Sequence, residues 1–141
     1  MAIWFRPFML SDLTAARAGT LVAHLGIELT AFGDDWLEGT LPVDARTQQP
    51  YGILHGGASV VLAETLGGYA ANLCVDPSRF RCVGQEISAS HLRPVESGLV
   101  TGRATPVHLG RRSQVWQIAI RNAAGQPTCL SRLTMAVLEG A

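Results

Sequence analysis

The stretch from Gln48 to Cys74 constrains this chain more than any other part of the sequence. A polar loop containing Pro50 and Gly52 leads into an apolar run of helical length that carries one acidic side chain, Glu64. Apolar residues fall on every side of such a helix, so we expect it to be buried all round. Burying a lone carboxylate costs free energy, and Glu64 therefore needs either a basic partner or a chemical role.

The start of this predicted helix is free of bulky side chains. His55, Gly56 and Gly57 lie where the helix should begin. The glycines are also typical of a tight turn, and a histidine at a helix start often serves as a cap. However, a helix start offers unpaired N–H groups and the positive end of the helix dipole, which can polarise a carbonyl. Gln49, on the preceding loop, could bind the same carbonyl, place a water or simply stabilise the loop.

The spacing of these groups indicates a dimer. Gly56 and Glu64 are eight residues apart, which corresponds to about 12 Å along a straight helix. Groups that act on one carbon must come within about 3–3.5 Å of it. If both groups act on one carbonyl, Glu64 must come from a second copy of the helix, antiparallel across a two-fold axis. We therefore expect a homodimer with shared active sites.

The segment from Asp44 to Gly67 resembles the signature of the hotdog-fold acyl-CoA thioesterases. It places Gln, then His six residues later, then Glu nine residues beyond. More narrowly, it is similar to the branch with 1,4-dihydroxy-2-naphthoyl-CoA hydrolase, the enterobactin proofreading thioesterase and one type of 4-hydroxybenzoyl-CoA thioesterase. The likeness extends from about residue 21 to residue 137, with His108-Leu-Gly-Arg111 as a further match.

The resemblance implies roles for individual residues. The family's matching Gln and His, here Gln49 and His55, help to orient the thioester, and the backbone N–H of Gly56 polarises its carbonyl. The matching acid, Glu64, either attacks the carbonyl or activates a water, and the sequence leaves both routes open. Gly68 stands where some relatives carry a Ser or Thr that holds the water, so we assign no such role here.

Substrate-binding candidates lie mostly beyond the long helix. Arg93, Arg111 and Arg112 could meet the phosphates of coenzyme A as bidentate partners, or be solvated charges at strand ends. We favour Arg111, which follows the glycine turn that matches the family. His91 is placed on a strand, where it could line the acyl pocket. The candidate set is His91, Arg93, His108, Arg111, Gly57 and Gly68.

Composition narrows the remaining possibilities. The 141 residues predict one domain, spanning 1–141, and equal numbers of basic and acidic residues, 11 of each, do not indicate a nucleic-acid or membrane surface. A hydrophobic content of 48% with 16% charged residues favours self-association, and the family implies a homotetramer. Three cysteines in apolar surroundings indicate core thiols in a reducing, cytoplasmic protein. No metal-ligand spacing, nucleotide-binding glycine pattern or serine-elbow motif is present, so we expect no metal and no cofactor, since coenzyme A belongs to the substrate.

The rest of the chain predicts an α+β fold. Ser11 is a plausible N-cap of a short helix that ends near Gly19, followed by a turn at 21–24. Alternating apolar positions predict a hairpin from residues 27–31 and 36–43. Further strands are expected at residues 82–92, 98–108, 112–122 and 128–138. Five or six antiparallel strands wrapped round one long buried helix is also the hotdog fold that the resemblance implies.

The leading functional prediction is an acyl-CoA thioesterase that hydrolyses an aryl-CoA or similar acyl thioester. The candidate substrates include 4-hydroxybenzoyl-CoA and 1,4-dihydroxy-2-naphthoyl-CoA. Tyr69 would suit a flat aromatic acid, although it is equally a core residue. One alternative is a hotdog enoyl-CoA hydratase or dehydratase, and another is a non-catalytic acyl-CoA-binding module, which makes no demand on Glu64.

Overall fold

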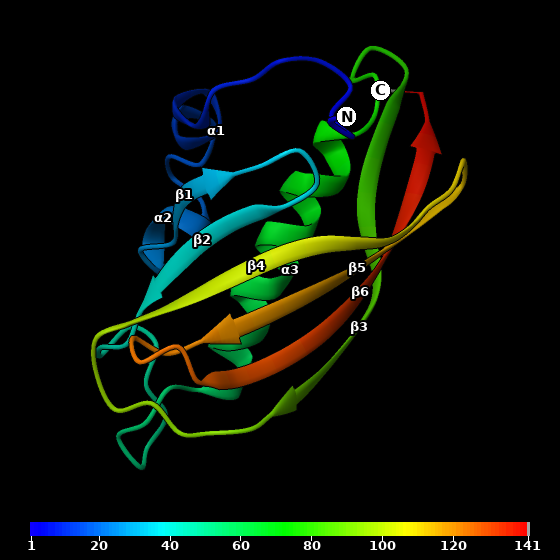
Figure 1. Cartoon of the computed structure of the whole chain (residues 1–141). Helices are drawn as coiled ribbons and strands as arrows, with labels where there is room; N and C mark the ends of the chain where they lie inside the picture. The colour runs from blue at the N-terminus through cyan, green and yellow to red at the C-terminus, as the bar shows by residue number, and fades with distance from the viewer. Residues whose placement is uncertain (141) are drawn as a thin grey trace.

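A computed structural model of the chain describes residues 1–140, and a curved antiparallel sheet wraps round one long helix at its centre (Figure 1). The strands follow the order β1-β2-β4-β5-β6-β3. This arrangement confirms the predicted α+β class, with six strands. The elements are α1 (Leu10–Ala16), α2 (Leu21–His24), β1 (Glu28–Phe32), β2 (Leu37–Pro42), α3 (Gly56–Leu73), β3 (Phe80–His91), β4 (Leu99–Leu109), β5 (Ser113–Arg121) and β6 (Pro127–Glu139).

The core lies between α3 and the concave face of the sheet. Alternate residues of β5 point inward, as the period of a strand requires, and Trp116 and Ile118 are fully buried. Leu66 of α3 is also fully buried and lies against two strand glycines, Gly39 and Gly102. A Cβ at either glycine would come within 2.8 Å of a Leu66 methyl. These two glycines therefore let the helix approach the sheet closely.

The helix α3 is not buried all round within one chain, which corrects the expectation from its sequence. Its buried side faces the sheet, whereas Glu64 and Asn72 are exposed and Val60 is half-buried. The sheet covers only one side of α3, and this leaves a stripe of the apolar helix open. Within residues 1–140, no helix has the length and hydrophobicity needed to span a bilayer.

The first helix begins earlier than predicted. Its N-cap is Met9, and Ser11, the predicted cap, lies inside the helix. The reason is that Asp12 reaches back, so that its carboxylate accepts a hydrogen bond from the Met9 N–H at 3.3 Å. The helix ends at Ala16 rather than near Gly19. The turn predicted at residues 21–24 is confirmed as α2.

The cysteines behave as core thiols. All three are free, Cys82 and Cys129 are buried, and Cys74 is half-buried at the end of α3. Burial raises the pKa of the Cys74 thiol to about 12. A thiol with so high a pKa carries little thiolate near neutrality and is a poor nucleophile.

Candidate functional site

A tight turn places Gln49 on the loop that precedes α3. The Gly52 N–H donates to the Gln49 carbonyl at 2.9 Å, and the Gln49 N–H donates to the Ile53 carbonyl at 2.9 Å. Pro50 occupies the second turn position, and Gly52 has a φ of 81°, a value that favours glycine. The Gln49 side-chain oxygen accepts a hydrogen bond from the Tyr51 N–H. Its NH₂ group makes no hydrogen bond within the described part of the chain, so it is available to a ligand.

His55 caps α3. The His55 Nδ1 accepts a hydrogen bond from the Gly57 N–H at 2.8 Å, and the backbone N–H of His55 donates to the Thr47 carbonyl at 2.8 Å. A neutral histidine that accepts at Nδ1 carries its proton on Nε2. The capping interpretation of His55 is therefore correct, and it leaves the Nε2–H able to donate to a substrate.

The first backbone N–H of α3 is unused. The N–H groups of Ala58 and Ser59 both donate to the His55 carbonyl, at 2.9 and 3.3 Å. The Gly56 N–H makes no hydrogen bond to any residue in 1–140, and the His91 ring lies directly beside Gly56. A Cβ at position 56 would come within 2.9 Å of His91 Nε2. The glycine thus keeps an N–H donor open at the positive end of the helix dipole.

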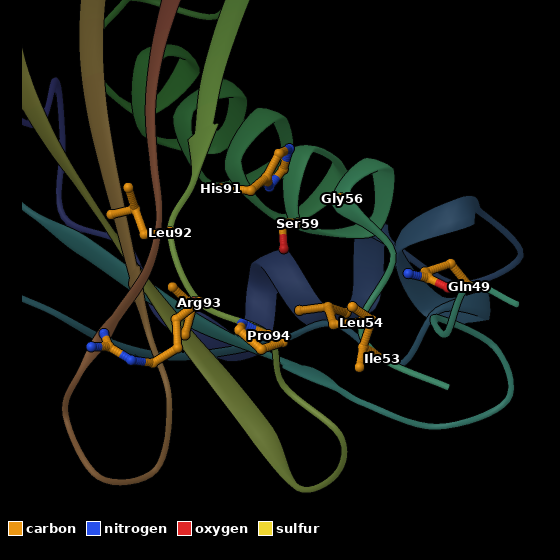
Figure 2. Close-up of a pocket in the computed structure, with 10 residues that line it drawn as sticks. Gln49, Ile53, Leu54, Gly56, Ser59, His91, Leu92, Arg93 and Pro94 are labelled. Atoms are coloured by element: carbon orange, nitrogen blue, oxygen red, sulfur yellow. The ribbon is translucent and has the colours of Figure 1, made fainter. Parts of the chain in front are cut away.

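A cavity of about 500 Å³ lies beside this N-terminal end of α3 (Figure 2). It brings together residues from the loop, from α3 and from the segment that follows β3. The Arg93 guanidinium donates to the Pro127 carbonyl at 3.0 Å and points away from Gly56 (Figure 2). Lining residues are Gln49, Ile53, Leu54, Gly56, Ser59, His91, Leu92, Arg93, Pro94 and Thr128.

Glu64 does not line this cavity. It lies eight residues beyond Gly56 on α3, and its carboxylate packs against Gly84 of β3 while the rest of the side chain is exposed. Burial on the β3 side raises the pKa of the Glu64 carboxyl. The Glu64 carboxylate makes no hydrogen bond or ion pair with any residue in 1–140. The structure therefore gives no support to the ion-pair interpretation of this acid.

The remaining predicted substrate-binding residues lie elsewhere in the chain. His91 pairs with Cys129 at the end of the sheet near Gly56, whereas His108 and Arg111 lie at the other end, at the β4–β5 hairpin. Arg111 borders a separate cavity of about 450 Å³. Its other lining residues are Arg79, Phe80, Arg112, Val137 and Glu139.

The two remaining glycine candidates both lie on α3. Gly57 is exposed beside His55, and Gly68 lies on the open side of the helix, where a Cβ would meet nothing within 4 Å. One chain thus brings together Gln49, His55, Gly56, Gly57, His91 and Arg93 near the start of α3. It does not bring Glu64, Gly68, His108 or Arg111 to them.

Sequence reasoning missed six lining residues, of which two, Ser59 and Thr128, have polar side chains; the other four are Ile53, Leu54, Leu92 and Pro94. Ser59 is buried and lies three residues after Gly56 on α3, so helical periodicity could have placed it on the same face. Thr128 reaches the cavity because its carbonyl accepts a hydrogen bond from the Leu92 N–H at 2.8 Å. That contact depends on β6 pairing with β3, which no local pattern indicates.

The chain is similar to proteins that hydrolyse thioesters. The sequence pattern of the family described as Thioesterase superfamily matches residues 51–129. The proofreading thioesterase EntH of Cronobacter turicensis is 54% identical over 96% of this chain and 98% of that protein. The 1,4-dihydroxy-2-naphthoyl-CoA hydrolase of Escherichia coli is 50% identical over 96% of this chain and 99% of that protein. The crystal structure of a thioesterase from Haemophilus influenzae matches with a TM-score of 0.94 at 52% identity, covering 97% of this chain and 95% of that one.

Proposed function

This chain belongs to the thioesterase superfamily and has its hotdog fold, and on that premise we propose that it hydrolyses an aryl-CoA or similar acyl thioester to the free acid and coenzyme A. The similarity to a hydrolase of 1,4-dihydroxy-2-naphthoyl-CoA supports an aromatic acyl group. The observation that carries the proposal is the unused Gly56 N–H beside a cavity that the Gln49 amide also lines.

In this mechanism the start of α3 binds the thioester carbonyl. The Gly56 N–H donates to the carbonyl oxygen, and the Gln49 amide and the His55 Nε2–H hold the thioester beside it. Negative charge develops on that oxygen as the carbon becomes tetrahedral. Fixed donors and the helix dipole stabilise the charge at the moment of reaction, which is where they lower the barrier.

Glu64 supplies the second half of the chemistry by one of two routes. As a general base it takes a proton from water, the water oxygen bonds to the carbonyl carbon, and the C–S bond breaks to release the CoA thiolate, which is then protonated. As a nucleophile its carboxylate displaces the thiolate to form a mixed anhydride, which water then cleaves. A carboxylate without a cationic partner among residues 1–140 suits either role.

The site requires a homodimer. Gly56 and Glu64 lie on one helix about 12 Å apart, so the acid that serves a given carbonyl comes from the partner subunit. Two features support this pairing: the open apolar stripe of α3 and the long edge strand β3, whose outer side pairs with no other described strand. We further propose that two dimers form a homotetramer.

Coenzyme A would then extend across the subunit boundary. The arginines at the β4–β5 hairpin, Arg111 and Arg112, line one cavity with Arg79, and this hairpin is at the end of the molecule toward which α3 runs (Figure 1). Leu73 ends that helix nine residues after Glu64, or about 13.5 Å further along. In an antiparallel pair of α3 helices, the end of one subunit that carries these arginines extends beyond the thioester bound at the start of the partner's helix. It is suited to bind the phosphates of a CoA whose pantetheine arm spans the gap.

The test is release of free thiol from a panel of acyl-CoA thioesters, comparing the wild type with Glu64→Ala. We expect turnover of aromatic thioesters by the wild type and a loss of several orders of magnitude in the variant. Hydration of an enoyl-CoA without thiol release would indicate the hydratase alternative. Unchanged thioester binding with no turnover by either protein would indicate a binding module.

A further inference from the structure

We propose that Gly84 of β3 is a positioning residue for the Glu64 carboxylate, an inference that rests on the proposed role of Glu64 in hydrolysis. Gly84 touches no substrate in this proposal. Its lack of a side chain creates the space in which the carboxylate lies, and this space determines where the acid points.

The contact between the two residues is close. A Cβ at position 84 would come within 3.0 Å of Glu64 Cδ and 3.3 Å of Oε2, and closer still to Oε1. The carboxyl group, with Oε1 nearest, therefore occupies the space that a Cβ at position 84 would fill. Among residues 1–140 nothing else holds the Glu64 carboxylate by a hydrogen bond or an ion pair, so this contact limits its position on the β3 side.

The backbone itself does not require glycine at position 84. Six glycines of the described chain have positive φ, and Gly84 is not one of them. A glycine inside a strand lowers stability unless another group approaches closely. The register of β3 also shifts between Gly84 and Glu86, which marks a bulge at this point. The bulge type that requires glycine places it at positive φ, which Gly84 does not have, so the requirement here is for space around the acid.

An alanine at position 84 should disturb catalysis more than folding. The Glu64 carboxylate is the free end of a flexible side chain, so it can move away from the new methyl without moving the backbone. A displacement of about 1 Å at a reacting group can reduce the rate by about 10²-fold. In the shared site that we propose, the groups that bind the carbonyl belong to the partner subunit and stay in place. We therefore expect kcat to fall about 10- to 100-fold while KM changes little.

Gly102→Ala is the matched control. Gly102 is also a strand glycine that faces α3, but its Cβ would meet Leu66 at 2.8 Å and Leu62 at 3.3 Å rather than the acid. The Gly102→Ala substitution should lower the melting temperature and leave kcat near the wild-type value. Gly84→Ala should instead lower kcat and leave the melting temperature near the wild-type value. Sedimentation checks the oligomeric state of all variants.

Combining Gly84→Ala with Glu64→Asp tests the positional cause. Aspartate is shorter and escapes the added methyl, so the double variant should lose much less activity than the product of the two single losses predicts. If Gly84→Ala does not fold, Gly84→Ala in the Glu64→Ala background should fold normally, because the group that clashes has gone.

Several results would overturn the inference. These are a kcat for Gly84→Ala within two-fold of wild type, multiplicative losses in the double variant, or misfolding that persists without Glu64. If Glu64→Ala itself keeps full turnover, the proposed function fails and this inference fails with it. If Glu64→Ala is inactive and Gly84→Ala is normal, only the inference fails.

Discussion

His55 caps α3 through Nδ1 and, in the proposed mechanism, donates to the thioester through Nε2. Asparagine at this position would keep the cap, because its side-chain oxygen can accept the same hydrogen bond from the Gly57 N–H. It has no donor where the imidazole Nε2–H lies. We therefore expect His55→Asn to lower kcat/KM by about 10²-fold, as measured by thiol release, with an unchanged midpoint of chemical unfolding.

His55→Ala provides the comparison, since it removes the cap and the donor together. It should lose activity and also about 1 kcal/mol in the free energy of unfolding. If the asparagine variant keeps full activity, His55 only caps the helix. If it is as unstable as the alanine variant, the asparagine oxygen does not replace the Nδ1 acceptor.

The raised pKa of Glu64 predicts how rate and stability depend on pH. Because burial raises this pKa, a rate that needs the ionised acid should increase as pH rises through the raised value. The folded state keeps the Glu64 proton to a higher pH than the unfolded state does. The contribution of the protonated Glu64 carboxyl to the free energy of unfolding is therefore fully present below the ordinary glutamate pKa. This contribution is lost as pH rises through the raised pKa.

Glu64→Gln should remove this pH-dependent loss of stability. Denaturation by urea from below the ordinary glutamate pKa up to neutrality, compared with wild type, measures the effect. We expect the difference in stability between the two proteins to shift in favour of the variant as pH rises. A difference that stays constant over this range would show that the folded structure does not raise the pKa of Glu64.

At the scale of elements, Asn72 joins the last turn of α3 to the start of β3. Its Nδ2 donates to the Cys82 carbonyl at 3.0 Å, and its Oδ1 accepts from the Cys82 N–H at 2.8 Å. Removing both bonds leaves an edge-strand peptide group without a protein partner. Asn72→Ala should lower the free energy of unfolding by about 1–3 kcal/mol, measured by chemical denaturation.

Asn72→Asp is the informative control. Aspartate keeps the acceptor for the Cys82 N–H but loses the donor, so its stability should lie between those of the wild type and Asn72→Ala. Equal stability of all three proteins would mean that water replaces both hydrogen bonds at no cost.

Elements could be predicted from sequence more reliably than the contacts between them. The apolar run predicted a helix that begins at residues 55–57 and extends to Cys74, and α3 is Gly56–Leu73. The alternating runs predicted the strands to within about two residues, since side-chain period is a local property. The pairing of β6 with β3 is long-range, and it brings Thr128 to the cavity. The packing of Gly84 against Glu64 likewise depends on tertiary structure, and nothing in the sequence around either residue indicates it.

The candidate site shows the same difference between features set by local sequence and features set by long-range contacts. The loop and helix start carry their own signals, so Gln49, His55 and Gly56 were predicted and lie together. The all-round burial expected for α3 was wrong for one chain, because hydrophobicity does not distinguish a residue covered by the sheet from one that a second subunit would cover.

In the assembled protein, we predict that each site is built from two subunits. A protein with Glu64→Ala lacks the acid, and a protein with both Gln49→Ala and His55→Ala lacks groups that bind the carbonyl. Each should be inactive alone. In a mixed dimer, one of the two sites pairs an intact helix start with an intact acid, because the damaged groups both fall in the other site.

Subunit exchange between the two inactive proteins should therefore restore activity. Random pairing makes half of the dimers mixed, and each mixed dimer has one working site, so about a quarter of all sites should recover. Thiol release after mixing measures the recovery, and differently tagged subunits, recovered together, verify the exchange. The control mixes Glu64→Ala with a protein that carries all three substitutions, which places no intact acid in any subunit and should stay inactive. Verified exchange without recovery would mean that Glu64 serves the carbonyl of its own chain, which the spacing along α3 forbids unless the helix breaks between residues 56 and 64.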